Sequence, residues 1–108
     1  MAVTATQSVE RSGNFAVGRY IDTGTAAAIA ITCGFLPRYV KVVNVDSGDM
    51  VEWYEGMAAA SACKTTGATG VRTKITTLGI TVNSRGFTIG LDLDVNVTSE
   101  QLSWTAHG

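Results

Sequence analysis

A strict alternation of apolar and polar residues over positions 86–98 constrains the fold more than any other feature of this sequence. Every even position in the run is Gly, Thr, Asp or Asn. The odd positions are Phe87, Ile89, Leu91, Leu93, Val95 and Val97. This periodicity is typical of an extended strand with one buried face, here with a kink at Gly90. It predicts a strand over 86–98 whose six apolar residues lie in the core.

Shorter alternating segments occur along the rest of the chain. Leu102, Trp104 and Ala106 repeat the pattern after a polar stretch, which predicts a terminal hairpin with 86–98. Phe15, Val17 and Ile21 share one parity, which is typical of a strand. Further strands are expected at 26–32 (preferred over a short helix), 38–45, 50–55, 71–77 and 80–82, with turns at 22–25, 46–49 and 83–86. Residues 56–70 fit a helical turn at 57–62 or a short strand and loop equally well.

These segments define the expected architecture. The chain has 108 residues, the size of one domain, and it is rich in Thr, Val and Gly, the residues of strands and tight turns. We expect an all-β fold: a single-domain antiparallel β-sandwich of about eight strands, jelly-roll-like, over residues 15–108. Residues 1–14 lack a sustained period and are expected to form an extended N-terminal arm.

Charge and hydropathy exclude several functional classes. Eight basic residues face nine acidic ones, a net charge of −1, which leaves no field to attract nucleic acid. The longest apolar run, 26–31, is far shorter than the roughly 20 residues of a membrane span, and the N-terminal segment has no apolar stretch typical of a signal peptide. We therefore expect a protein made in the cytoplasm, with neither nucleic acid nor membrane as a partner.

No motif indicates catalysis, a metal or a cofactor. Cys33 and Cys63 are interpreted as small buried apolar residues, although their spacing leaves a bridge open, and His107 as a solvated tail residue. The run 92–96 imitates the opening of a calcium loop but lacks its Gly and its closing Glu, so we interpret it as the solvated face of a strand. Glu52 and Glu55 flank two aromatic residues, but positions 52 and 55 point to opposite faces of a strand and cannot form a catalytic pair.

One strand has apolar residues on both faces. In 38–45, Val40 and Val42 lie on one side and Val43 and Val45 on the other, a pattern typical of a central strand, a bulged strand or an interface. Since only 16% of the residues are charged and 45% are apolar, some apolar surface is expected to face a partner, and we expect a homo-oligomer, most simply a trimer. The candidate interface residues are Tyr39, Val43, Val45, Trp53, Tyr54 and Met57.

Four segments carry a resemblance to a known group of proteins. They are 32–44 (TCGFLPRYVKVVN), 51–57 (VEWYEGM), 86–90 (GFTIG) and 102–106 (LSWTA). In pattern and order they resemble small virion proteins of tailed bacteriophages, over roughly residues 28–107. Chains of that group resemble head decoration (cement) proteins or domains of tail appendages, often trimeric β-sandwiches.

The resemblance implies a non-enzymatic structural protein on the capsid surface of a virion, which oligomerises and bridges subunits of the major capsid protein. It supplies no catalytic residues. The alternative is a carbohydrate-binding or adhesion module of a tail appendage. In that hypothesis Trp53, Tyr54 or Trp104 would stack on a sugar ring.

Overall fold

The computed structural model describes residues 14–21 and 27–108, and within these ranges it contains eight strands and no helix. The strands are β1 (Phe15–Ile21), β2 (Ile29–Thr32), β3 (Tyr39–Asn44), β4 (Met50–Tyr54), β5 (Ser61–Thr65), β6 (Arg72–Asn83), β7 (Gly86–Ile89) and β8 (Gln101–His107). All pairings are antiparallel, in the order β1-β8-β3-β4-β5-β6-β7-β2. The all-β class and the number of strands are confirmed. No described segment forms a helix long and apolar enough to cross a membrane.

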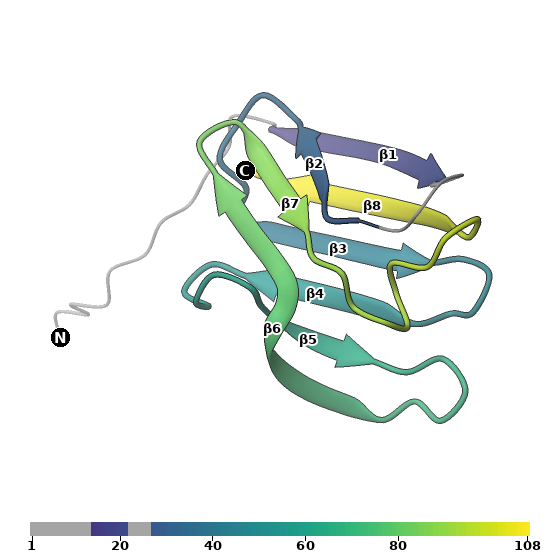
Figure 1. Ribbon diagram of the computed structural model, residues 1–108. Coiled ribbons are helices and arrows are strands. Elements are labelled where there is room, and N and C mark those ends of the chain that lie inside the picture. Colours follow the sequence, from purple (N-terminus) through teal and green to yellow (C-terminus); the bar gives the residue numbers. More distant parts are fainter. Residues whose placement is uncertain (1–13, 22–26) are drawn as a thin grey trace, which may run out of the picture.

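The single sheet curls into two layers because β6 changes partner along its length. Residues 72–75 pair with β5 and residues 81–83 pair with β7, while Ile80 pairs with both strands, opposite Ser61 and Ile89. Between them the register shifts and Leu78 takes a positive φ of 61°. The second half of β6, with β7 and β2, thereby lies over the layer formed by β1, β8, β3, β4 and β5 (Figure 1). This strand order by itself does not establish the jelly-roll arrangement that we expected.

The core lies between the two layers. One layer contributes Val40, Val42, Val51, Trp53, Leu102 and Ala106, and the other contributes Ile29, Ile80, Phe87 and Ile89. The rings of Phe87 and Trp104 pack in a T-shaped arrangement, with their centroids 5.3 Å apart and an interplanar angle of 75°. Burying each large aliphatic or aromatic side chain contributes about 1.5–3 kcal/mol, so this cluster is what holds the curled sheet closed.

The strand predicted over 86–98 is correct only as far as Ile89. Beyond it, Asp92 Oδ1 accepts hydrogen bonds from the N–H groups of Asp94 (3.0 Å) and Val95 (3.2 Å), and the chain turns. An Asp side chain that bonds the backbone two and three residues ahead competes with strand pairing. Leu93 is consequently 83% exposed while Val95 is buried. The predicted terminal hairpin is also wrong, because β8 pairs with β1 and β3.

Other predictions divide between confirmation and correction. The strand at 15–21 is confirmed, as are the turns at 46–49 and 83–86, which join β3 to β4 and β6 to β7. The two strands expected at 71–77 and 80–82 form one, β6, and the undecided segment 56–70 contains β5. Cys33 and Cys63 are free thiols. The turn at 22–25 and all but Asn14 of the expected arm lie outside the described residues.

Candidate interaction surface on the open face of the sheet

The layer of β1, β8, β3, β4 and β5 has a second side, turned away from β2 and β7, which we call the open face. Strand register defines its residues, because directly paired residues project to the same side. They are Phe15, Val17, Arg19 and Ile21 on β1; Gln101, Ser103, Thr105 and His107 on β8; Tyr39, Lys41 and Val43 on β3; Met50, Glu52 and Tyr54 on β4; and Cys63 and Thr65 on β5. No described strand covers this face (Figure 1).

A row of ring side chains crosses four strands of the open face. Register places Phe15 beside His107, His107 beside Tyr39, and Tyr39 beside Tyr54. The successive ring centroids lie 4.8, 5.8 and 5.2 Å apart, with tilts of 57°, 51° and 57°, within the range of favourable aromatic contacts. The row is therefore a preformed ridge of aromatic surface, open to solvent at Phe15 and Tyr54.

Glu52 anchors one end of this row. Its Oε2 accepts hydrogen bonds from the hydroxyl groups of Tyr39 (2.7 Å) and Tyr54 (3.2 Å), and its Oε1 accepts one from Arg72 on β6 (3.1 Å). Its side chain is only 11% exposed. The three donors satisfy a buried carboxylate that would otherwise be costly, so they fix both tyrosine rings in place.

The titration of this group reflects the same contacts. Burial acts to raise the pKa of Glu52, but the hydrogen bonds from Tyr39, Arg72 and Tyr54 outweigh it and hold that pKa below its ordinary value. Burial, together with the hydrogen bond to the carboxylate, raises the pKa of the Tyr39 hydroxyl. Both groups thus keep one charge state at neutral pH, with Glu52 ionised and Tyr39 protonated.

Three of the candidate interface residues meet on the open face, namely Tyr39, Val43 and Tyr54. Val45, just beyond β3, is exposed, and its N–H donates to the Gln101 carbonyl (3.0 Å). Trp53 does not belong to this surface, because it projects from the opposite side of β4 into the core and donates through Nε1 to the Ala58 carbonyl (3.3 Å). Met57 lies in the turn after β4, half-buried against the core, and its Sδ accepts the Tyr54 N–H (3.3 Å).

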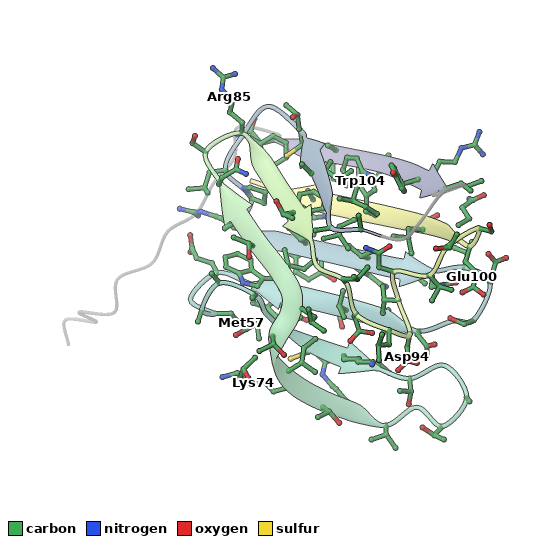
Figure 2. The ribbon with its side chains drawn as sticks, viewed as in Figure 1. Met57, Lys74, Arg85, Asp94, Glu100 and Trp104 are labelled. Atoms are coloured by element: carbon green, nitrogen blue, oxygen red, sulfur yellow. The ribbon has the colours of Figure 1, made fainter. Side chains whose placement is uncertain are left out.

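The sugar platform expected from three aromatic residues does not form, because only Tyr54 lies on the open face. Trp104 lies on the inner side of β8, between the layers (Figure 2). Glu55 pairs with Arg38 (3.3 Å), so Glu52 and Glu55 have separate partners and do not face one site. The sequence analysis was correct in separating them.

Sequence analysis missed the β1 side of the surface. It recognised the shared parity of Phe15, Val17 and Ile21, but this parity faces outward. The inward positions include Gly18, where a Cβ would lie 2.5 Å from the Trp104 ring, so the bulk of Trp104 occupies the space under β1. His107 is exposed, as expected, but it is the last residue of β8 and contacts Phe15 and Tyr39. A glycine opposite a tryptophan is the signal that could have indicated the outward parity.

A second polar cluster lies at the other side of β5. The Lys64 ammonium lies 3.0 Å from Asp92 Oδ1 and 2.6 Å from Asp94 Oδ2, in the loop before β8 (Figure 2). Burial acts to lower the pKa of Lys64, but the hydrogen bonds to Asp94 and Asp92 outweigh it and raise that pKa. Residues 92–96, which imitate the opening of a calcium loop, thus form a turn and not the solvated face of a strand. The cation that their carboxylates contact is the Lys64 ammonium. Over 14–21 and 27–108 no group of His, Cys, Asp and Glu could hold a metal.

The open face combines a row of aromatic rings, aliphatic side chains on β1 and β3, polar side chains on β8 and β3, and one internally satisfied carboxylate. Comparison with protein-family models, curated proteins and solved structures gives no match for this chain.

Proposed function

We propose that this chain is a non-enzymatic structural protein of a tailed-bacteriophage particle, most specifically a decoration (cement) protein of the head. In this role it self-associates and bridges subunits of the major capsid protein on the capsid surface. The open face is the observation that carries the proposal. The resemblance of residues 28–107 to small virion proteins supports the choice of particle.

The composition of the open face suits a protein partner. Phe15, Val17 and Ile21 are all more than half exposed, and contiguous exposed apolar side chains of this kind mark interaction sites on soluble proteins. The apolar side chains of this face lie in the ring row and along β1, whereas Lys41 on β3, beside Thr105 on β8 and Glu52 on β4, makes its middle polar. A mixed surface of this kind is usual in non-obligate protein interfaces. The near-neutral charge supports a partner that is neither nucleic acid nor membrane.

Bridging would stabilise a capsid through mass action. A protein that binds a surface present only in the assembled shell lowers the free energy of that state relative to the dissociated subunits. The contact needs area and shape complementarity, which a rigid sheet supplies. It needs no reactive group.

One observation favours a second function, a carbohydrate-binding or adhesion module of a tail appendage. Tyr54 is 42% exposed and lies beside Glu52 and Arg72. An aromatic surface next to fixed hydrogen-bonding groups is a combination that suits a sugar. The tilted packing of the ring row favours a protein partner over a sugar, because neighbouring rings cover parts of each other's faces.

Location within the particle tests the proposal. Purified particles would be separated into heads and tails, and the chain detected by mass spectrometry; we expect it in heads. Recombinant protein should also bind heads that lack it. Val43→Asp, on the open face, should abolish this binding, whereas Leu93→Asp adds the same charge at an exposed loop position off that face and should preserve it. Recovery with tails, together with binding to host glycans, would instead establish the adhesion module.

A further inference from the structure

The free edge of β1 is a second surface, distinct in chemistry from the open face. Within the described residues β1 pairs with β8 and with no other strand. The Asn14 carbonyl accepts a hydrogen bond from the Gly108 N–H (3.0 Å), so the backbone groups of even positions point toward β8. Because these groups alternate along an antiparallel strand, those of Phe15, Val17, Arg19 and Ile21 point away from the sheet.

This edge has only one of the features that usually prevent edge-to-edge pairing, the charged side chain of Arg19. Natural edge strands are protected by Pro, by Lys, by bulges or by very short length. β1 is seven residues long, pairs with β8 without a register shift, and carries Arg19 as its only charged residue. Phe15, Val17 and Ile21 are 54%, 62% and 51% exposed. A strand of this composition is a template for another strand.

We propose that β1 pairs antiparallel with β1 of a second copy of this chain, about a two-fold axis at Gly18. In this register Phe15 lies opposite Ile21 of the second copy, and Val17 lies opposite Arg19. All four outward-pointing residues then form hydrogen-bonded pairs. The aromatic and aliphatic side chains at the two ends of the strand cover each other, which is a favourable cross-strand combination.

The other registers are less favourable. Shifting the two-fold axis to residue 19 places the two Arg19 side chains directly opposite each other, and like charges in that position destabilise a sheet. Shifting the axis to residue 17 leaves Ile21 without a partner in the other β1. The register centred on Gly18 is the one that pairs every outward residue and separates the arginines.

This inference rests on the self-association in the proposed function and specifies its contact. Two-fold pairing joins two sheets into one and makes a combined open face, since Phe15, Val17 and Ile21 belong to that face on both copies. It produces dimers, in place of the trimer that the sequence favours. Interfaces of stable complexes bury about 800 Å² per partner, more than one strand pair supplies, so we expect a dissociation constant in the micromolar range.

Sedimentation equilibrium of the full chain, with variants at Val17, tests the contact. The Val17 N–H points away from β8, so Val17→Pro removes a donor needed only by the second copy. It should weaken dimerisation by about tenfold or more, while Val17→Thr, which keeps the N–H, should have a much smaller effect. Thermal unfolding of both variants at low concentration, where monomers dominate, should give similar midpoints.

A charge pair tests the register and does not depend on the proline variant folding. Val17→Glu places a carboxylate opposite Arg19 of the second copy, whereas Val17→Lys places an ammonium there. Both lose the same apolar side chain. Because the two-fold axis creates the pair twice, the Glu variant should dimerise about tenfold more tightly than the Lys variant. Equal affinities would overturn the register.

Hydrogen exchange gives an independent readout along β1. The amides of Ala16, Gly18 and Tyr20 should be protected at every concentration, and those of Phe15, Val17, Arg19 and Ile21 only where dimers form. Self-association that leaves the odd amides unprotected, or that persists unchanged in Val17→Pro, would overturn the β1 contact but preserve self-association by the proposed function. A chain that stays monomeric at all concentrations would overturn both.

Discussion

Glu52 is the residue on the open face whose surroundings most restrict its chemistry. Its carboxylate lies on the outer side of β4 and is nevertheless nearly buried. Tyr39 on β3, Tyr54 on β4 and Arg72 on β6 each donate a hydrogen bond to it. Hydrogen bonds to charged groups are worth about 1.5–3 kcal/mol each when both partners are well placed. The carboxylate therefore links three strands through side chains as well as through the backbone.

Acid should weaken this link. The folded pKa of Glu52 lies below the ordinary value of 4.5, so above pH 4.5 the carboxylate is ionised in both states and its stabilisation is complete. As the pH falls toward the folded pKa, the unfolded chain takes up the proton first and the stabilisation is lost. We expect Glu52→Gln to cost about 1–3 kcal/mol at pH 7, and the cost to fall as the pH is lowered from 4.5 through the folded pKa, measured by urea unfolding over a pH series.

Glu55→Gln is the matched control, since the Glu55 side chain is 61% exposed in its pair with Arg38. An exposed pair contributes about 0–1 kcal/mol. A Glu52→Gln cost that is the same throughout the pH series would contradict the assigned role of the ionised carboxylate.

Substitutions at Leu93 and Val95 distinguish the observed turn at Asp92 from the strand predicted over residues 86–98. Both are odd positions of the alternating run, so a strand would bury both, but the Asp92 turn exposes Leu93 and buries Val95. Leu93→Asp should change the free energy of unfolding by less than about 0.5 kcal/mol, whereas Val95→Asp should cost several kcal/mol or prevent folding. Thermal unfolding of the two variants is the measurement, and comparable losses would restore the strand.

At the scale of elements, the sequence predicts strands correctly where the backbone N–H and C=O groups bond only to neighbouring strands. The bounds of β1, β3, β4 and β8 match the expected segments to within one or two residues, because runs rich in β-branched and aromatic residues give way there to Gly, Asp or other polar residues. The prediction failed at residues 90–98, where the Asp92 side chain replaces a neighbouring strand as acceptor for backbone N–H groups. Hydrophobic alternation does not report such local competition.

The residues of the open face were predictable only in part, because some of them come together through the pairing of strands that are distant in the sequence. Val43 follows from the two-sided pattern of residues 38–45, and Tyr39 and Tyr54 were named with it as candidate interface residues. The register of β3 and β4 places all three on one face. Phe15 and His107 join them through the pairing of two distant segments, β1 with β8, and Arg72 reaches Glu52 from β6, two strands away from β4 in the sheet. Partner choice among antiparallel strands depends on the whole sheet, and no single segment encodes it.

The bend of β6 gives a prediction about backbone strain. Leu78 has a φ of 61° and a half-exposed side chain, so it adopts a left-handed conformation without burial in compensation. That conformation costs a non-glycine residue about 1–2 kcal/mol, which Leu78→Gly would relieve. We expect the variant to be as stable as the original chain or more stable, by up to about 1 kcal/mol, in thermal unfolding.

Thr76→Gly is the control for this substitution. Thr76 is an exposed residue of the same strand with an ordinary φ, so glycine there should destabilise by about 0.5–1 kcal/mol. Equal destabilisation at both positions would show that the left-handed conformation of Leu78 carries no strain.

At the scale of the whole molecule, the sheet joins the two ends of the described chain. β1 is an edge strand of the sheet and pairs with β8, and the Gly108 N–H donates to the Asn14 carbonyl. The connections between β3, β4, β5, β6 and β7, by contrast, join strands that are neighbours both in sequence and in the sheet. The order of the strands in the larger layer is thus set by the pairing of β8 between β1 and β3. This pairing unites residues 80–92 positions apart in β1 and β8 (Ile21↔Gln101 to Phe15↔His107) and 58–68 positions apart in β3 and β8 (Asn44↔Leu102 to Tyr39↔His107).

This arrangement predicts that the chain tolerates circular permutation. Joining Gly108 to Met1 makes residues 1–13 the linker across a distance that one hydrogen bond already spans, and new ends can be opened between Ala68 and Thr69, in the exposed turn joining β5 to β6. All strand pairs are retained, so we expect cooperative unfolding with a loss of about 1–3 kcal/mol from the changed loop closure.

A permutant opened between Val42 and Val43 is the control. It interrupts β3, which is paired on both sides and buries Val42 in the core. It should not fold cooperatively, as judged by thermal unfolding. If the permutant opened at the turn failed as well, that result would contradict the pairing of β1 with β8, on which the aromatic row and the free edge of β1 depend.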